Sequence, residues 1–596
     1  MFNYNFRSIM KNNILIFGLL LALFTGCSES FLEENPKNFL SPDNFFTSVD
    51  DAVVAVNGVY GSVGTGASWG IYDVNMLIAD GGTSVQGTRV TGETHAGIAT
   101  YISTPTTKSI KEIYQYSYIA IQRANLVINR VEQMDPIGTG IPKSMKNRII
   151  GEAKFLRALC YFNLVRYYGG VPLMTEEVTD MNNLFVTRNS IEEVYIQIIE
   201  DFEFAAEHLY YKGGSALEPV YEASDNGRVP KSAAYGMLAK VYLTAASYKR
   251  HSKFHDAWNT LKNINSYEWV DASQYYQLAE QNAKAVIDIA SAGGNLGLLD
   301  DYAKNFIQGS ENSKESLFAI QFGPDTEEGG HVGIWSAIQG NTKMPEGGYG
   351  RINPQPEFTE SYIQKYVTTP YNGLDSVNTD PRFVWNIGTI KYAKTKLISH
   401  LKIKEFTFRK YRLDHIVNFT NEVNFPVLRY ADVLLMYAEA LNENGKPADA
   451  AAYVNMIRER ARNGIQTKTV LGAPSGLDYP ESNEPAAIAL NFDEEQMREI
   501  IMQERKWELC YEGQSRFDEV RMGTLVEDVR ELVDYANATG NANTQSYFEM
   551  VALGLGAQAT TTPSSPASGI TEEDRLFPIP KVETDINSNL VQNPGW

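Results

Sequence analysis

Pairs of amphipathic helices joined by tight turns constrain the fold of this chain more than any other sequence feature. The clearest pair spans residues 427–463, where Val433 and Leu441 belong to one apolar helical face. Gly445 is suited to end the first helix, and Pro447 is suited to the first turn of the second, where its missing N–H is harmless. Two short antiparallel helices with alanine at their contacts are the unit of tetratricopeptide repeats.

Further helical segments recur along the chain, although they do not follow a regular period of about 34 residues. Gly169-Gly170 is expected to stop the helix that starts near Glu152, and Ser190 with Glu193 has the spacing of a capping box. We therefore expect a mainly α fold, built as a degenerate tetratricopeptide-like scaffold of helix pairs. Besides the pair above, helices are expected at 50–61, 109–132, 152–168, 190–209, 231–248, 272–291 and 493–511.

Two long stretches, at about 62–108 and 293–426, differ in composition from the helical segments. They are rich in Gly, Thr, Asn and Tyr, and Leu317 to Phe322 alternates like a short strand. We expect long irregular loops with a few short β-hairpins here. Because long loops on a rigid scaffold often carry binding sites, the sequence predicts a single domain over 46–596 with ligand-binding insertions.

The N-terminal residues predict export and a lipid anchor. Arg7 and Lys11 precede a short apolar run that ends in Thr25-Gly26-Cys27. This order matches a bacterial lipobox, with Phe24 where Leu is usual, and the run is shorter than the roughly 20 residues of a spanning helix. An ordinary secretory signal that happens to contain a cysteine is the alternative. We expect a signal peptide over 1–26, lipidation of Cys27 and a tether over 27–45.

The charge and the cysteines exclude several classes of function. A net charge of −20 argues against binding to nucleic acid or to an anionic membrane surface. Cys160 and Cys510 lie in apolar helical contexts and are expected to be buried free thiols. Without a CxxC or a Cys/His cluster no zinc site is expected. Asp300-Asp301 is the single candidate for a calcium site, and no other cofactor is expected.

Patterns that suggest catalysis have structural interpretations. The segment Gly66-Ala67-Ser68-Trp69-Gly70 fits a nucleophile elbow, but no hydrophobic strand leads into it. The most patterned acids alternate with arginines near the C-terminus and are interpreted as a structural ion-pair ladder at i, i+4 spacing. A pair of carboxylates in a glycosidase is the alternative. The ladder comprises Glu504, Glu508, Glu512 and Asp518 with Arg505, Arg516 and Arg521.

Short motifs recur at characteristic places along the chain. RYAD at 429–432 precedes LLMYAEALNE, LFPIP stands at 576–580, and QNPGW closes the chain at 592–596. AKFLRA at 153–158 leads into YYGGVPL. Together these motifs resemble the SusD/RagB family of surface lipoproteins from Bacteroidota. One departure is that two residues stand between Gly513 and Arg516, where the family usually has one.

This resemblance implies a non-enzymatic nutrient-binding lipoprotein on the outer-membrane surface. Members lie over the mouth of a SusC-like TonB-dependent transporter and deliver oligosaccharides to it, or peptides in the RagB branch. The helical scaffold would contact the barrel, and the loop half would face the nutrient. A peptide-binding RagB-type member and a surface-anchored glycoside hydrolase are the alternatives to glycan binding.

Aromatic residues in the two insertions are the candidates for ligand binding, because sugar rings stack on flat aromatic faces. Trp335 and Trp69 lead, since each lies in or beside a Gly-rich stretch. The alternative is that both only pin their loops to the core. Packing is expected for Trp258, Trp269, Trp507 and Trp596. The other candidate ligand-binding residues are Tyr72, Tyr101, His331, Asn341, Tyr349 and Arg351.

Overall fold

The structure, a computed structural model, describes most of the chain from Phe45 to Trp596. The predicted signal peptide, Cys27 and nearly all of the tether lie outside the described residues. These are 45–64, 71–72, 80–88, 96–99, 101–178, 185–251, 261, 263–323, 329–331, 333–335, 338–339, 347–348, 350, 352–362, 380–388, 390–393, 396–399, 407–411, 422–463, 485–538 and 570–596.

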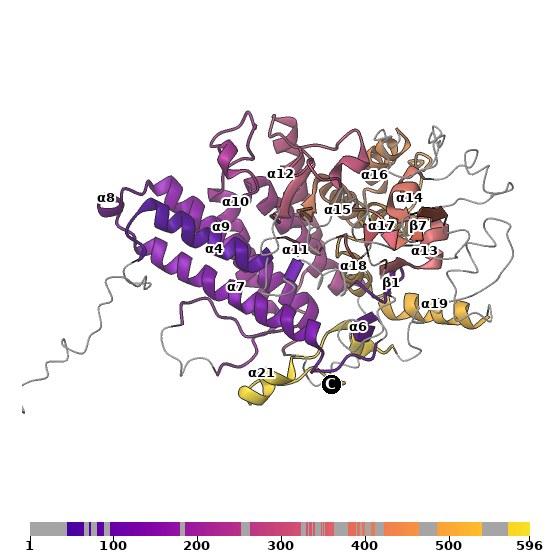
Figure 1. The fold of residues 1–596 in the computed structure, drawn as a ribbon, viewed down its shortest axis with the longest axis horizontal. Helices are drawn as coiled ribbons and strands as arrows, with labels where there is room; N and C mark the ends of the chain where they lie inside the picture. Colours follow the sequence, from indigo (N-terminus) through magenta and orange to yellow (C-terminus); the bar gives the residue numbers. More distant parts are fainter. Residues whose placement is uncertain are drawn as a thin grey trace, which may run out of the picture.

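Long helices form a row in which each packs against the next, and this row confirms the mainly α scaffold (Figure 1). The order of contact follows the order of the chain, as expected for helix pairs. The row consists of α4 (Val49–Gly64), α7 (Lys108–Gln133), α9 (Lys143–Tyr168), α10 (Ile191–His208), α11 (Lys231–His251), α12 (Ala272–Ser291), α15 (Tyr430–Glu443), α16 (Pro447–Arg462) and α17 (Glu494–Leu509).

The ends of these helices follow the local signals in the sequence. Helix α9 ends at Tyr168, and Gly169 takes a left-handed φ of 74° that a residue with a side chain rarely adopts. Ser190 and Glu193 form the capping box of α10, with the Ser190 N–H donating to Glu193 at 2.7 Å. Gly445 and Pro447 connect α15 to α16 as the sequence predicts.

Strands are short, and among the described residues they pair only two at a time. β7 (Ile390–Ala393) and β8 (Lys396–Ser399) form an expected hairpin. β2 (Ser316–Ile320), which overlaps the strand predicted over Leu317 to Phe322, pairs instead with the distant β10 (Phe425–Arg429). The remaining pairs are β1 (Gln86–Thr88) with β5 (Ile352–Pro354), β3 (Ile338–Gln339) with β4 (Gly347–Gly348), and β6 (Ile387–Gly388) with β9 (Thr407–Phe408).

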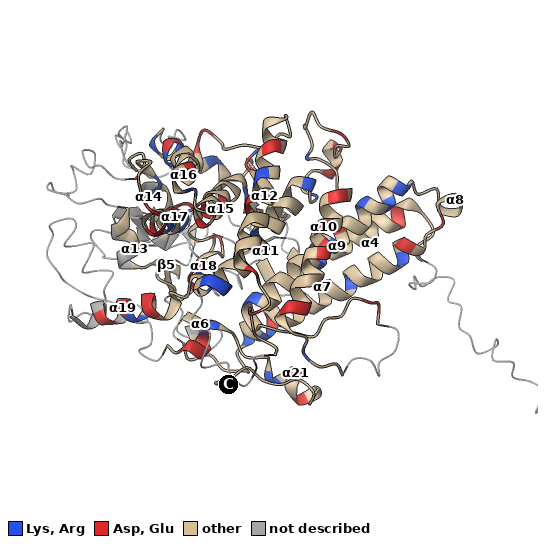
Figure 2. Ribbon diagram, turned by 180° about the vertical axis from the view of Figure 1, so that it is seen from behind, with Lys and Arg blue, Asp and Glu red and all other residues tan. Residues whose placement is uncertain are grey.

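Short helices complete the fold around the scaffold. Figure 1 places α13 and α14 with the strand-bearing half, and α21 beside the first helices. Figure 2 shows acidic and basic residues interspersed over α7, α9 and α19. The short helices are α6 (Ala96–Ala99), α8 (Pro136–Thr139), α13 (Pro356–Ser361), α14 (Pro381–Asn386), α18 (Ser515–Met522) and α21 (Lys581–Ile586). The longer α19 (Leu525–Ala538) follows α18 and also lies outside the row.

The closing motif of the chain is tucked against the end of α9. The buried guanidinium of Arg188 donates to the Val591 carbonyl and to the Asn593 side chain, both at 2.8 Å. Phe577 stacks on Tyr167 with ring centroids 5.1 Å apart. No helix of the described residues has both the length and the apolar character that crossing a membrane requires.

Candidate ligand-binding face

The two insertions predicted from composition meet in space. β1 of the first insertion lies antiparallel to β5 of the second, with Gly87 opposite Asn353. Gln355 extends the joint, because its N–H donates to the Val85 carbonyl at 2.9 Å and its side chain donates to the Thr83 carbonyl at 3.3 Å. Thr83 and Gln355 are 272 positions apart in the sequence. The insertions therefore meet in one region, and most of the described residues that join them are buried.

Trp335 and His331 lie in a turn beside this joint. The Trp335 carbonyl accepts from the Ile352 N–H of β5 at 3.3 Å, and the His331 carbonyl accepts from the Ile334 N–H at 3.1 Å. Trp335 packs into the main core and keeps only 9% of its surface exposed, whereas His331 is partly exposed. The tryptophan therefore pins its loop, and a ligand in this conformation meets only the exposed remainder of its side chain.

The two tyrosine candidates of the first insertion differ in position. Tyr72 is 1% exposed, and its hydroxyl accepts from the Asn163 amide at 2.7 Å. Burial raises its pKa, and it offers almost no surface to a ligand. Tyr101 is partly exposed, and its hydroxyl donates to the Gly82 carbonyl at 2.7 Å. Tyr101 therefore stays a candidate, and Tyr72 is a core residue.

The remaining candidates lie where the structure gives no description. Trp69, Asn341, Tyr349 and Arg351 are all outside the described residues, as is the Gly66–Gly70 segment. Of the tryptophans expected to pack, Trp507 is 6% exposed, as predicted, and Trp269 packs partly buried against the core.

The first insertion is anchored to α18 by a carboxylate that sequence analysis did not single out. Asp80 accepts from the backbone N–H groups of Ser515 and Arg516, at 3.3 and 3.0 Å, at the start of that helix. A carboxylate is favourable at a helix N-terminus. Burial nevertheless raises the pKa of Asp80 to about 7. The only sequence signal for this anchor is an acid directly before Gly81-Gly82.

Ser84 and Glu519 make a second anchor. The Ser84 N–H donates to the Glu519 carboxylate at 3.0 Å, and the Lys506 ammonium donates to the Ser84 hydroxyl at 2.9 Å. Burial, together with the nearby charge of Asp528, raises the pKa of Glu519 to about 8. Residues 80–88 are therefore held to the helical half mainly by polar contacts.

A buried network of charges anchors the second insertion. Glu508 of α17 accepts from Arg382 at 2.9 Å, from Arg429 at 3.2 Å and from Arg460 at 2.5 Å. Burial alone would raise the pKa of Glu508, but Arg460 and Arg429 outweigh it and lower the pKa to about 2. Arg382 also pairs with Glu504 at 2.7 Å.

These contacts correct the predicted i, i+4 ladder while keeping its structural role. Arg505 pairs with Asp432 and Asp518, at 2.9 and 2.8 Å, instead of with an acid one turn away. Glu512 pairs with Arg429 at 2.8 Å. Most partners come from distant segments because Glu504 and Glu508 are buried and face other elements, whereas Arg521 does pair with Asp518 one turn away, at 2.9 Å. The displaced Arg516 donates to the Asp574 carbonyl and lies over the Phe577 ring.

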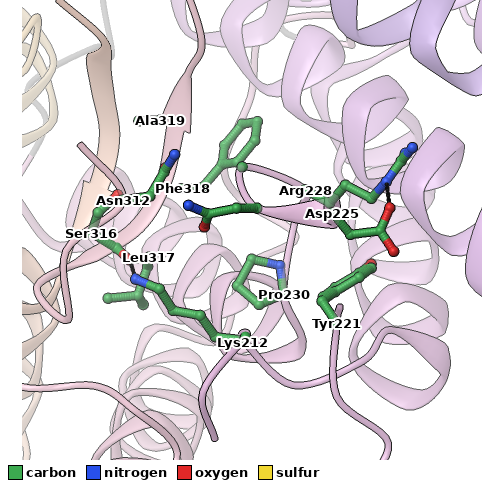
Figure 3. Close-up of a pocket in the computed structure, with 13 residues that line it drawn as sticks. Lys212, Tyr221, Asp225, Arg228, Pro230, Asn312, Ser316, Leu317, Phe318 and Ala319 are labelled. Carbon is green, nitrogen blue, oxygen red and sulfur yellow. Dashed lines mark hydrogen bonds and ion pairs between the residues drawn. The ribbon is translucent and has the colours of Figure 1, made fainter. Parts of the chain in front are cut away.

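A small cleft below β2 is a structural joint (Figure 3). Lys212 donates to the carbonyls of Ser313 and Ser316, the latter at 2.5 Å, and burial lowers its pKa to about 8. Arg228 pairs with Asp225 at 2.7 Å on the opposite side. The cavity is about 20 Å³, which is enough for one water and too small for a sugar ring.

The aspartate considered for calcium caps a helix, and the two cysteines are buried. Asp301 is buried and accepts from the Ala303 N–H at 3.0 Å, which caps a short 3-10 helix. Among the described residues no group of three His, Cys, Asp or Glu side chains is arranged to hold a metal ion. Cys160 and Cys510 are buried free thiols, as predicted.

Two family models match the chain. One is described as the SusD family and covers residues 402–596, and the other, described as starch-binding associating with outer membrane, covers residues 82–243. Among curated relatives, SusD-like protein P25 of Formosa agariphila is 25% identical over 91% of this chain and 95% of its own length. A SusD-like protein of Bacteroides ovatus is 25% identical over 76% of this chain and 77% of its own.

Solved structures share the fold along nearly the whole chain. A SusD homologue from Bacteroides thetaiotaomicron has a TM-score of 0.72 at 23% identity and covers 93% of this chain and 98% of its own. A laminarin-binding SusD-like protein has a TM-score of 0.61 at 19% identity over 92% of this chain and 99% of its own.

Proposed function

Since this chain belongs to the SusD family, whose proteins bind ligands and catalyse no reaction, we propose that it is a lipid-anchored, cell-surface glycan-binding protein. It captures an oligosaccharide and passes it to a SusC-like TonB-dependent transporter in the outer membrane. The hydrolase alternative is not retained, because the family is non-catalytic.

The proposal of a binding face rests on the observation that the two insertions lie together in the structure. Residues from both are brought to one region by the β1–β5 pair. The pair itself is largely buried, so a ligand would contact residues of both insertions around it rather than a single loop. The partly exposed His331 and Tyr101 lie in these insertions with the edge of Trp335. The binding face of the proposal also includes Trp69, Asn341, Tyr349 and Arg351. The laminarin-binding neighbour supports a glycan as the ligand class.

Calorimetry against a panel of soluble glycans, with laminarin and starch oligosaccharides first, tests this function. We expect micromolar to millimolar affinity, or about −4 to −8 kcal/mol, for one member of the panel. Trp335→Ala and Trp69→Ala, shown to be folded by circular dichroism, should each weaken binding about tenfold. Ile137→Ser, on the exposed helix α8, is the control and should bind like the wild type.

Two results would overturn parts of this proposal. Wild-type affinity in both tryptophan variants would refute the binding face, although capture by other loops would stand. Binding of short peptides, with none of the glycans bound, would favour the peptide-binding alternative.

The anchor and the transporter have separate tests. Cys27→Ala should release the protein into the soluble fraction, because several acyl chains anchor stably and none would remain. A pull-down from detergent-solubilised outer membrane should recover a barrel protein in near-equal amount. Membrane retention of the variant, or recovery of no barrel at several salt concentrations, would contradict the respective part.

A further inference from the structure

A groove of about 550 Å³ lies on the helical half and is lined by no residue of the two insertions. Its walls come from α7, from residues 172–178 and 185–186, and from α21 with the segment that follows it. The volume lies within the range of about 300 to 1,000 Å³ that is usual for small-molecule sites.

The groove is mostly apolar and open to solvent at its rim. Ile119, Phe185 and Ile586, which line it, are 45%, 54% and 64% exposed. Met174 and Leu590 add further apolar surface. Clustered exposed side chains of this kind mark a binding site more often than isolated ones do.

Most polar side chains of the groove are already used within the protein. Tyr118 donates its hydroxyl to the Pro172 carbonyl at 2.7 Å, and Asn587 donates to the Val186 carbonyl at 2.8 Å. A sugar would bury many hydroxyl groups here and find few partners for them, which costs about 1–3 kcal/mol for each unsatisfied group. The groove is therefore unsuited to the glycan of the proposed function.

One carboxylate gives the groove its charge. Glu583 is the single charged side chain among the lining residues. One of its oxygens accepts from the Gln115 amide at 2.8 Å, and the other has no hydrogen-bond partner among the described residues. The charge of the buried Arg188 acts on Tyr114 and Tyr118, but its guanidinium donates to the carbonyls of Tyr168 and Val591 rather than to Glu583. A ligand with a donor at this end would therefore satisfy the carboxylate.

We propose that this groove binds an amphiphilic molecule that has an apolar body and a primary ammonium head. The body fills the space between α7 and α21, and the head pairs with the open oxygen of Glu583. Charge complementarity selects the ammonium over a carboxylate, because a second negative charge would face Glu583 in partly desolvated surroundings. This site is independent of the glycan-binding face.

Calorimetry of the full chain with three matched probes tests the site. The probes are 4-phenylbutylamine, 4-phenylbutanol and 4-phenylbutyrate, which share an apolar body and differ in the head. We expect one equivalent of the amine to bind at least tenfold more tightly than the acid, with the alcohol between them. Glu583→Gln keeps an acceptor for Gln115 and removes the charge, so it should abolish the preference for the amine over the acid.

Variants of the rim separate this site from general attraction of cations to an acidic protein. Phe185→Ser and Ile586→Ser, at exposed positions that should not disturb folding, are expected to weaken all three probes at least fivefold. Ile137→Ser, 93% exposed on α8 and away from the groove, is the matched control and should change nothing. No saturable binding, equal affinity for amine and acid, or amine binding unaffected by the rim variants would each overturn the proposal.

Discussion

The helical scaffold is held together by extended packing between long helices, whereas the two insertions have little secondary structure of their own and combine core contacts with a few polar anchors. In the scaffold, all 14 residues of α15 are buried, and its neighbours α12, α16 and α17 pack directly on it. In the insertions, strands have at most five residues, and the described segments reach the scaffold through core residues such as Trp335 and Tyr72 as well as through buried charged or polar groups. Asp80, Ser84 and Arg382 are the main examples.

The two regions therefore differ in how many side chains share the free energy that stabilises them. Packing among helices is shared by many side chains, so each contributes a small part. A buried ion pair concentrates its effect in a few atoms, because the loss of one partner leaves an uncompensated charge. Single substitutions at the anchors should therefore disturb the insertions more than surface charge changes disturb the helices.

The largest effect is expected for Arg382→Met, which removes the cation that joins α14 to α17. Asp380, Glu504 and Glu508 lose a shared partner in a buried site, so the free energy of unfolding should fall by about 3–5 kcal/mol. Chemical denaturation followed by circular dichroism measures this change. Lys284→Met, at an exposed pair with Asp288, is the control and should cost less than about 1 kcal/mol. Equal losses in the two variants would contradict the comparison.

The scaffold was largely predictable, because its signals are local. The glycines after Tyr168, the Ser190–Glu193 box and the turn between Gly445 and Pro447 each act within a few residues, and the structure confirms each of them. Apolar periodicity then determines which side of a helix is buried.

The insertions were predictable only in their extent. Nothing in the residues near Thr83 indicates a partner 272 positions away, and the acids of α17 gave no indication that their arginines come from other segments. The prediction of the binding face has the same limit, namely that the sequence does not reveal contacts with distant segments, and Tyr72 is an example. Its place in a Gly-rich stretch suggested exposure, but its hydroxyl has a partner on α9, and it is buried.

Stability should also depend on pH through the anchors of the first insertion. The folded pKa values of Asp80 and Glu519, about 7 and about 8, lie above the ordinary 3.8 and 4.5, so the folded chain holds these protons more tightly than the unfolded chain. The stabilisation by protonation is complete below about pH 4 and is lost as pH rises to about 8.

Thermal unfolding between pH 5 and pH 9 measures this dependence. Asp80→Asn keeps an acceptor for the N–H groups of α18 without a charge, and it should flatten the fall. Asp51→Asn is the control, because hydrogen bonds from Ser48 and Thr47 outweigh burial and lower the pKa of Asp51, so its titration lies below this window. A slope unchanged by Asp80→Asn would show that the anchor carboxyl does not hold its proton.

A smaller effect is expected where the scaffold meets a strand of the second insertion. A Cβ at Gly236 of α11 would lie 2.5 Å from the buried Leu428 side chain of β10, and Leu317 and Val433 lie 3.5 Å away. Gly236→Ala should therefore overpack the site and cost about 1–3 kcal/mol, despite the better helix propensity of alanine. An unchanged midpoint of urea unfolding would mean that the Leu428 side chain moves aside for the added methyl group at no cost in stability.

The smallest expected effect, with the opposite sign, is at Gly58 of α4. This helix position has no atom within 4 Å of where a Cβ would lie, so alanine adds no clash. Alanine also reduces the conformational freedom of the unfolded chain, and Gly58→Ala should raise the free energy of unfolding by about 0.5–1 kcal/mol. Because the Gly58 carbonyl still accepts from Arg123 and Ser62, the packing of α4 on α7 is retained. The same substitution thus stabilises the scaffold at an open position and destabilises it at the junction with the insertion. If both glycine variants shifted the urea midpoint in the same direction, local packing would not be what separates the two regions.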